Sequence, residues 1–175
     1  MDKLLIQNAR VYQNGQFVRA DVLCGDALIA KIGENLTDEE ARVIQADGLR
    51  LVPGFIDVHT HGAAGVDVNA ADEAGLRRIA AFFATQGVTA FNASVLTDTP
   101  ETTEKCLGAI ANVMSDRGMG AQLLGAHLEG PFLAKEYKGA MPEALLREGD
   151  EKLLRAYQNR FPGVIRYITV SPEVP

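Results

Sequence analysis

The first 52 residues alternate short apolar runs with turn residues. Apolar and β-branched side chains gather over residues 4–6, 16–18, 21–24 and 27–32. Asn14-Gly15, Gly25-Asp26 and Gly33 separate these runs, and Asn-Gly and Gly-Asp pairs are typical of hairpin turns. The pattern predicts a small β module, a β-sandwich, over residues 1–52, which Pro53 brings to an end.

After Pro53 the hydrophobic period alternates between that of a strand and that of a helix. Leu76, Ile79 and Phe83 mark the buried stripe of the first helix, and Gly87 ends it. The β-α-β-α-β-α-β order predicts an α/β fold with parallel strands in a sheet that is covered on both faces. The predicted strands span residues 55–58, 88–96, 122–128 and 164–170, and the predicted helices span 72–86, 98–118 and 150–159.

Two architectures fit this order, an open doubly wound sheet and part of a (β/α)8 barrel. A complete barrel needs about 250 residues, whereas residues 53–175 supply four strands. No G-x-G-x-x-G sequence or phosphate-binding loop follows the first strand, which weakens the case for a nucleotide-binding open sheet. We therefore expect the N-terminal half of a (β/α)8 barrel, about four βα units over residues 53–175, that stops after its fourth strand.

Composition narrows the class of protein and its partners. Hydrophobic residues make up 47% of the chain, enough for a sizeable core, and 23 acidic residues outnumber 17 basic ones. No cluster of Lys and Arg stands out, so we expect neither nucleic acid nor a membrane as a partner. Cys24 and Cys106 are isolated, as is usual in a reducing compartment. Without a signal peptide or a run of ~18 apolar residues, the chain is expected to be cytoplasmic.

Two of the three histidines follow the first strand of the α/β part. His59 and His61 are two residues apart, so in a strand their side chains point the same way. They lie where barrel enzymes keep their active sites, at the C-terminal end of a strand, and neutral imidazole is a ligand for zinc and similar metals. The pair predicts a metal site. Since H-x-H alone is common, two ordinary hydrogen-bonded histidines are the alternative.

The third histidine belongs to a second motif at the end of the third predicted strand. His127 and Glu129 share a face by the same alternation. A carboxylate at a buried strand end is costly unless it is paired or bound to a metal. We therefore interpret Glu129 as a metal ligand and His127 as its neighbour. An ion pair between Glu129 and a lysine or arginine is the alternative.

Other polar residues near these strand ends give weaker signals. Asp57 shares the face of His59 but lies deeper in the strand, and we expect it to have a structural role. Asn92, Ser94 and Thr97 lie near the end of the second strand. These three residues either line the same site at the strand ends or serve as packing and turn residues.

These motifs resemble those of a known family. Residues 53–62 (PGFIDVHTHG) resemble the first-strand signature of the amidohydrolase superfamily, and residues 26–33 with 47–48 resemble its N-terminal β module. Residues 127–133 (HLEGPFL) are similar to those of the N-acetylglucosamine-6-phosphate deacetylases, as are residues 138–140 and 171–175. The H-x-H pair is a feature of the whole superfamily, whereas the second motif is specific to this family.

The resemblance implies hydrolysis of the N-acetyl group of N-acetylglucosamine 6-phosphate, giving glucosamine 6-phosphate and acetate. It implies that Glu129 is the principal ligand of a divalent metal such as zinc or iron, and that His59 and His61 hold a second metal in members with two. Ala140 and Met141 correspond to a substrate-contacting loop, in which the family usually has a polar residue where Met141 stands. The family's aspartate base and its other ligands come from later strands, so no catalytic residue is expected in this chain.

Three functions are therefore considered for the 175-residue chain. The favoured one is the N-terminal part of a deacetylase, with little or no activity alone, a phosphorylated amino sugar as its partner, and a homo-oligomeric state. The second is a non-catalytic half barrel that binds or assembles through open sheet edges. The third is another amidohydrolase that acts on a cyclic amide, a class that usually lacks the HLEGP motif.

Overall fold

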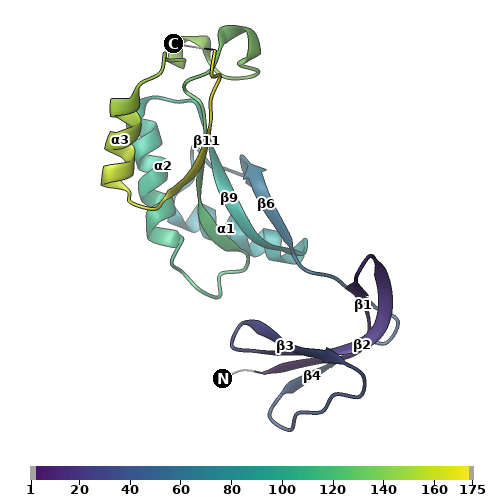
Figure 1. Ribbon diagram of the computed structural model, residues 1–175. Coiled ribbons are helices and arrows are strands. Elements are labelled where there is room, and N and C mark those ends of the chain that lie inside the picture. Colours follow the sequence, from purple (N-terminus) through teal and green to yellow (C-terminus); the bar gives the residue numbers. More distant parts are fainter. Residues whose placement is uncertain (1–2, 174–175) are drawn as a thin grey trace. The chain divides into compact units, whose positions relative to one another are not determined.

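The computed structural model describes residues 3–173, which belong to two compact units that divide between Pro53 and Gly54. Residues 174 and 175, the end of the segment 171–175 that the resemblance singled out, lie outside the described residues. Figure 1 shows the two units.

The first unit is one mixed sheet. Its strands lie in the order β3-β2-β1-β4, with β5 also beside β1. The first three strands pair antiparallel, whereas β4 and β5 run parallel to β1. Within residues 3–53 all strands belong to this sheet, so the second layer of the predicted β-sandwich is not found there. The strands are β1 (Leu4–Gln13), β2 (Gln16–Gly25), β3 (Leu28–Gly33), β4 (Arg42–Gln45) and β5 (Arg50–Leu51).

Turn residues set the two hairpins of this sheet. Asn14 and Gly15 have φ values of 50° and 83°, and two positive φ values are what a two-residue hairpin turn requires. Asp26 and Ala27, with φ values of 54° and 61°, form the second turn, one residue later than predicted. The predicted strands 16–18 and 21–24 are one continuous strand, because no turn residue interrupts them.

The second unit has the predicted β-α-β-α-β-α-β order, and its strands are parallel. The strand order is β11-β10-β9-β6, so each strand lies beside the next one along the chain. This order runs in one direction, whereas the strand order reverses within a doubly wound sheet. The main elements are β6 (Phe55–Thr60), α1 (Glu73–Thr85), β9 (Val88–Leu96), α2 (Pro100–Val113), β10 (Gln122–Glu129), α3 (Glu151–Arg160) and β11 (Ile165–Thr169).

Four short elements lie in the loops of this unit. Two two-residue strands, β7 (Gly62–Ala63) and β8 (Val66–Asp67), pair after β6. Two 3-10 helices, η1 (Lys135–Tyr137) and η2 (Glu143–Leu145), follow β10. Within residues 3–173, none of the helices combines the length and the apolar character needed to cross a membrane.

Capping side chains begin the three helices of the second unit. Asp72 and Asp150 each accept a hydrogen bond from a backbone N–H in the first turn of α1 and α3, at 2.8 and 2.9 Å. The cap of α2 is Thr99 rather than the neighbouring Asp98, and Pro100 takes the first helical position, where its missing N–H costs nothing. The three helices were predicted, with their ends shifted by one to five residues.

One face of the sheet packs against all three helices. Phe91 and Val95 of β9 lie in a buried cluster together with Ile79 of α1, Ile110 of α2 and Tyr157 of α3. Because successive strand residues point to opposite faces, Ala93 shares this face with Phe91 and Val95, whereas Asn92 and Ser94 lie on the other face. That other face carries the polar residues of the strand ends.

The edge strand β6 is exposed rather than covered. The exposed fractions of Phe55, Ile56 and Val58 are 65%, 61% and 56%. The prediction of a sheet covered on both faces therefore holds for the inner strands β9 and β10, in which residues 91–95 and 125–128 are buried, and fails at the edge strand β6 within the described residues. The apolar run is present as predicted, but more than half of the surface of each of these three residues is exposed.

The two cysteines are expected to react at very different rates. Cys106 is buried in the core, and burial raises the pKa of its thiol to about 11. Because only the thiolate is nucleophilic, alkylation of Cys106 should be slow at pH 8 and should speed up as the pH rises toward 11. Cys24 is partly exposed. Mass spectrometry after iodoacetamide treatment at pH 8 should show one label, on Cys24, and a second only in urea. Equally fast labelling of both in the native chain would contradict the buried position of Cys106.

Candidate metal centre

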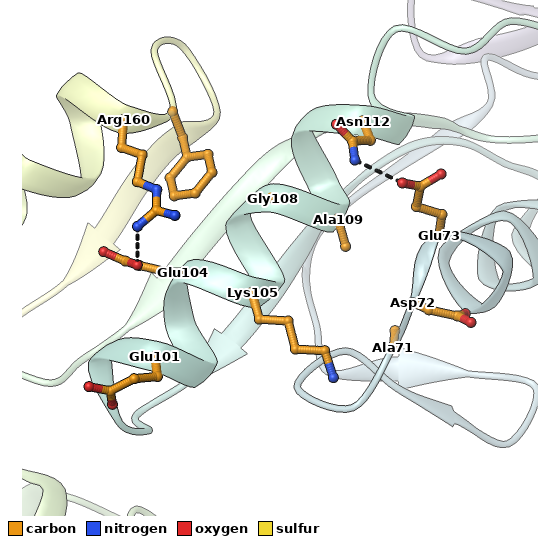
Figure 2. Close-up of a pocket in the computed structure, with 11 residues that line it drawn as sticks. Ala71, Asp72, Glu73, Glu101, Glu104, Lys105, Gly108, Ala109, Asn112 and Arg160 are labelled. Carbon is orange, nitrogen blue, oxygen red and sulfur yellow. Dashed lines mark hydrogen bonds and ion pairs between the residues drawn. The ribbon is translucent and has the colours of Figure 1, made fainter.

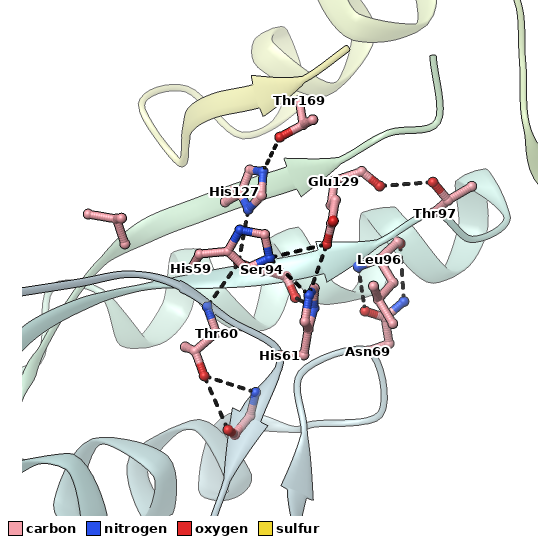
Figure 3. A network of polar contacts seen from close by, with 12 residues as sticks. His59, Thr60, His61, Asn69, Ser94, Leu96, Thr97, His127, Glu129 and Thr169 are labelled. Carbon is pink, nitrogen blue, oxygen red and sulfur yellow. Dashed lines mark hydrogen bonds and ion pairs between the residues drawn. The ribbon is translucent and has the colours of Figure 1, made fainter. Parts of the chain in front are cut away.

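Two strand ends bring the three predicted metal ligands together. His59 and His61 come from the end of β6, and Glu129 comes from the end of β10, with β9 lying between these strands (Figure 3). Oε2 of Glu129 lies 2.9 Å from Nε2 of His61 and 3.3 Å from Nε2 of His59. The two Nε2 atoms are 3.1 Å apart. Among the His, Cys, Asp and Glu side chains of residues 3–173, these three lie close enough together to hold a metal ion.

The spacing of these three atoms suits one small divalent ion. Zinc binds nitrogen and oxygen at about 2.0–2.2 Å, so two tetrahedral ligands lie about 3.4 Å apart. The separations of 2.9, 3.1 and 3.3 Å are slightly shorter than this. A small outward movement of the side chains would admit the ion.

Hydrogen bonding indicates which nitrogen of His61 is free. Nδ1 of His61 lies 3.2 Å from the backbone oxygen of Ser94, and a carbonyl only accepts, so Nδ1 carries a proton. In the neutral ring, Nε2 then presents a lone pair toward Glu129. Oε2 of Glu129 is buried and makes no hydrogen bond. Two acceptors facing each other are stabilised by a cation between them, and imidazole with carboxylate suits zinc or iron. A doubly protonated His61 paired with Glu129 is the alternative.

His127 is a neighbour of this group rather than a ligand. Its Nδ1 lies 2.9 Å from Oγ of Ser94 and its Nε2 lies 2.8 Å from Oγ1 of Thr169, so both ring nitrogens are engaged. The ring stacks on Tyr167 at 4.1 Å between centroids and packs edge-on against His59 at 4.9 Å. Burial, with a smaller effect of His59, lowers the pKa of His127 to about 4, so the ring is neutral at pH 7.

The residue after Glu129 has to be glycine. Gly130 has a φ of +87°, and a Cβ there would lie 2.1 Å from Oγ1 of Thr97. That hydroxyl donates to the backbone oxygen of Glu129 at 2.8 Å. The Glu-Gly pair of the second motif therefore lets Thr97 hold the backbone of the ligand at the strand end.

Some residues of this network were not singled out in the sequence. Tyr167 and Thr169 show the same two-residue alternation at the end of β11, and this signal could have found them. Asn69 lies in a loop and had no such signal. It accepts a hydrogen bond from the backbone N–H of Leu96 at 2.8 Å and donates to Leu96 and Asp98 at 3.2 Å. Asn69 thus ties the loop after β8 to the end of β9.

The predicted substrate loop is only partly open to solvent. Ala140 is exposed, whereas Met141 is buried. Lys138 donates from Nζ to the backbone oxygen of Met141 at 2.9 Å. Substrate contact by Ala140 and Met141 stays a prediction.

A hollow of about 540 Å³ lies on the helical side of the unit (Figure 2). Four of its polar side chains are paired with one another: Asn112 donates to Glu73 at 2.8 Å, and Arg160 forms an ion pair with Glu104. Gly108 contributes to its lining beside these pairs. None of the three side chains of the metal group lines this hollow.

Comparisons with known proteins point to one family of enzymes. A scan against protein-family models found no match. The chain is 31% identical over 173 residues to the N-acetylglucosamine-6-phosphate deacetylase of Lysinibacillus sphaericus, covering 98% of this chain and 45% of that protein. It is 37% identical over 182 residues to the human protein of the same name, covering 98% and 44%.

A solved structure of a protein with the same function in its name is also similar to this chain. The N-acetyl-D-glucosamine-6-phosphate deacetylase of Mycobacterium smegmatis, solved as a variant in complex with N-acetyl-D-glucosamine-6-phosphate, matches with a TM-score of 0.84 and 26% identity. The match covers 99% of this chain and 45% of that one. These names do not favour the two alternative functions. The chain is thus homologous over nearly its whole length to the N-acetylglucosamine-6-phosphate deacetylases, and it spans less than half of the length of the relatives it matches.

Proposed function

We propose that this chain supplies one wall of the metal site of an N-acetylglucosamine-6-phosphate deacetylase. The observation that carries the proposal is the convergence of Nε2 of His59, Nε2 of His61 and Oε2 of Glu129 within 4.8 Å of one another. The reaction is hydrolysis of the N-acetyl group of N-acetylglucosamine 6-phosphate to glucosamine 6-phosphate and acetate. The names of the homologues support this substrate.

We further propose that the second unit is half of a (β/α)8 barrel. The one-directional strand order supports this, as does the polar face opposite the helices. The exposed apolar side chains of β6 suit an edge that other elements cover in a longer protein. In the first unit, exposed Leu28 and Ile29 on β3 similarly support a β-sandwich with a second layer.

The residues of the site have separable roles. A divalent metal, when bound, lowers the pKa of water toward neutrality and polarises a carbonyl group. Glu129 and the two histidines would hold it, one or two ions in all. His127 stays neutral and keeps its ring in place between Ser94 and Thr169. The loop with Ala140 and Met141 would contact the sugar. The predicted homo-oligomeric state and cytoplasmic location stay predictions.

The 175-residue chain alone is expected to show no measurable deacetylation. Amide hydrolysis needs a general base within hydrogen-bond reach of the attacking water. In the described site, both nitrogens of His127 are engaged, and Oδ1 of Asp57 accepts from the backbone of His59. Acetate release from N-acetylglucosamine 6-phosphate should therefore equal that of a metal-only control with Zn²⁺ or Fe²⁺. Robust turnover by the purified chain would contradict the claim that it supplies only part of the site.

A further inference from the structure

The pairing of β6 with β9 breaks where the first histidine ligand stands. The register shifts between Asp57 and Thr60, so the regular ladder is interrupted around His59. Two successive backbone amides are held there by side chains. The N–H of His59 donates to Oδ1 of Asp57 at 3.0 Å, and the N–H of Thr60 donates to Oγ of Ser94 at 3.1 Å.

Ser94 holds His61 at two points. Its hydroxyl accepts from Thr60, the residue before His61, and its backbone oxygen accepts from Nδ1 of the His61 ring. The first contact fixes the backbone of the ligand, and the second fixes the rotation and tautomer of its ring. Ser94 is fully buried, so water does not take over these bonds.

The Ser94 hydroxyl is itself held by a chain of hydrogen bonds. Oγ is 2.9 Å from Nδ1 of His127, and Nε2 of His127 is 2.8 Å from Oγ1 of Thr169. This chain joins β9, β10 and β11 beside His59, His61 and Glu129 (Figure 3). A side chain with partners on β6 and β10 can set how far the ligands on those two strands lie from each other.

We propose that Ser94 and Asp57 are positioning residues of the metal centre, whose side chains replace the missing ladder bonds and hold His59 and His61 in ligand geometry. The proposal rests on the proposed metal site. Residues that orient metal ligands typically change metal affinity by roughly 10–100-fold when they are replaced. The loss of either side chain should have an effect of that size.

Titration of the complete 175-residue chain with Co²⁺, followed by visible absorption, tests this proposal. The variants are Ser94→Ala, Asp57→Ala and Asp57→Asn, with Thr103→Val as a control that removes a buried hydroxyl from α2. We expect Ser94→Ala and Asp57→Ala to bind Co²⁺ roughly 10–100-fold more weakly, with an altered spectrum because the ligand geometry changes. Asp57→Asn keeps the oxygen that accepts from His59 and should bind as the wild type does, as should Thr103→Val.

The outcomes separate the two proposals. If the wild-type chain binds no Co²⁺, the proposed metal site is wrong, and so are the positioning roles that depend on it. Wild-type binding with unchanged affinity and spectrum in Ser94→Ala and Asp57→Ala overturns the positioning roles alone. If circular dichroism shows that Ser94→Ala does not fold, the comparison of Asp57→Ala with Asp57→Asn tests the positioning role instead. Asp57 is only partly buried, so its replacement should leave the fold intact. Equal losses in these two variants would overturn the hydrogen-bond role.

Discussion

Replacing Glu129 with Gln is expected to weaken divalent-metal binding by more than the roughly 10–100-fold typical of changes outside the ligand set. Gln has nearly the shape of Glu but no charge, and a neutral amide is a poor ligand for zinc. The Glu129 oxygen lies 2.9 and 3.3 Å from the two histidine nitrogens. Removing its charge therefore removes the one anionic member of the group. Calorimetric titration of the chain with Zn²⁺ measures the change.

A matched control separates this effect from a general loss of negative charge. Glu136→Gln makes the same chemical change at an exposed position of η1 and should leave Zn²⁺ affinity unchanged. The metal-free chain should not lose stability in Glu129→Gln, because the buried Oε2 has no hydrogen bond to lose. Equal Zn²⁺ affinities of the two variants would exclude Glu129 as a ligand.

Replacing Phe91 with Ala is expected to lower the free energy of unfolding of the second unit by about 3–5 kcal/mol. Phe91 is 0% exposed and packs edge-on against Phe83, with 5.1 Å between the ring centroids. Truncation leaves a cavity between β9 and the helices that close packing does not fill. With typical stabilities of about 5–15 kcal/mol, this loss is large. Urea denaturation followed by circular dichroism measures it.

The neighbouring aromatic residue of α1 gives the control. Phe82 is 40% exposed, so Phe82→Ala removes an aromatic ring of the same size with much less loss of buried contact. Its cost should stay below about 1 kcal/mol. Similar losses in the two variants would contradict the placement of Phe91 at the centre of the core and Phe82 at its rim.

The helices and most strands could be predicted because their signals are local. Leu76, Ile79 and Phe83 recur at helical spacing, and Asp72 caps the helix that they line. The predicted helix 98–118 begins two residues too early, because Asp98 and Thr99 are adjacent cap-forming residues and the hydrogen-bond geometry selects Thr99. The strands β4 and β5 were missed. Residues 42–45 are all exposed and show no alternation, and these strands form by pairing with β1.

The three side chains that converge could be predicted from the sequence, but the framework that brings them together could not. Two-residue alternation at strand ends found His59, His61 and Glu129. Their convergence depends on the order of β6, β9 and β10 and on the register shift near His59, which are long-range pairings. Ser94 had only a weak signal, because its role depends on what lies across the sheet. The burial of Met141 likewise follows from tertiary packing.

Crystals of the chain grown with Zn²⁺ and measured at the zinc absorption edge test the proposed metal centre most directly. The anomalous difference map should show a peak about 2.0–2.2 Å from Nε2 of His59, Nε2 of His61 and Oε2 of Glu129. A second peak beside the histidines would indicate a two-metal site. A map with no peak at these atoms, or with His61 and Glu129 joined by a direct hydrogen bond in the presence of zinc, would contradict the metal centre.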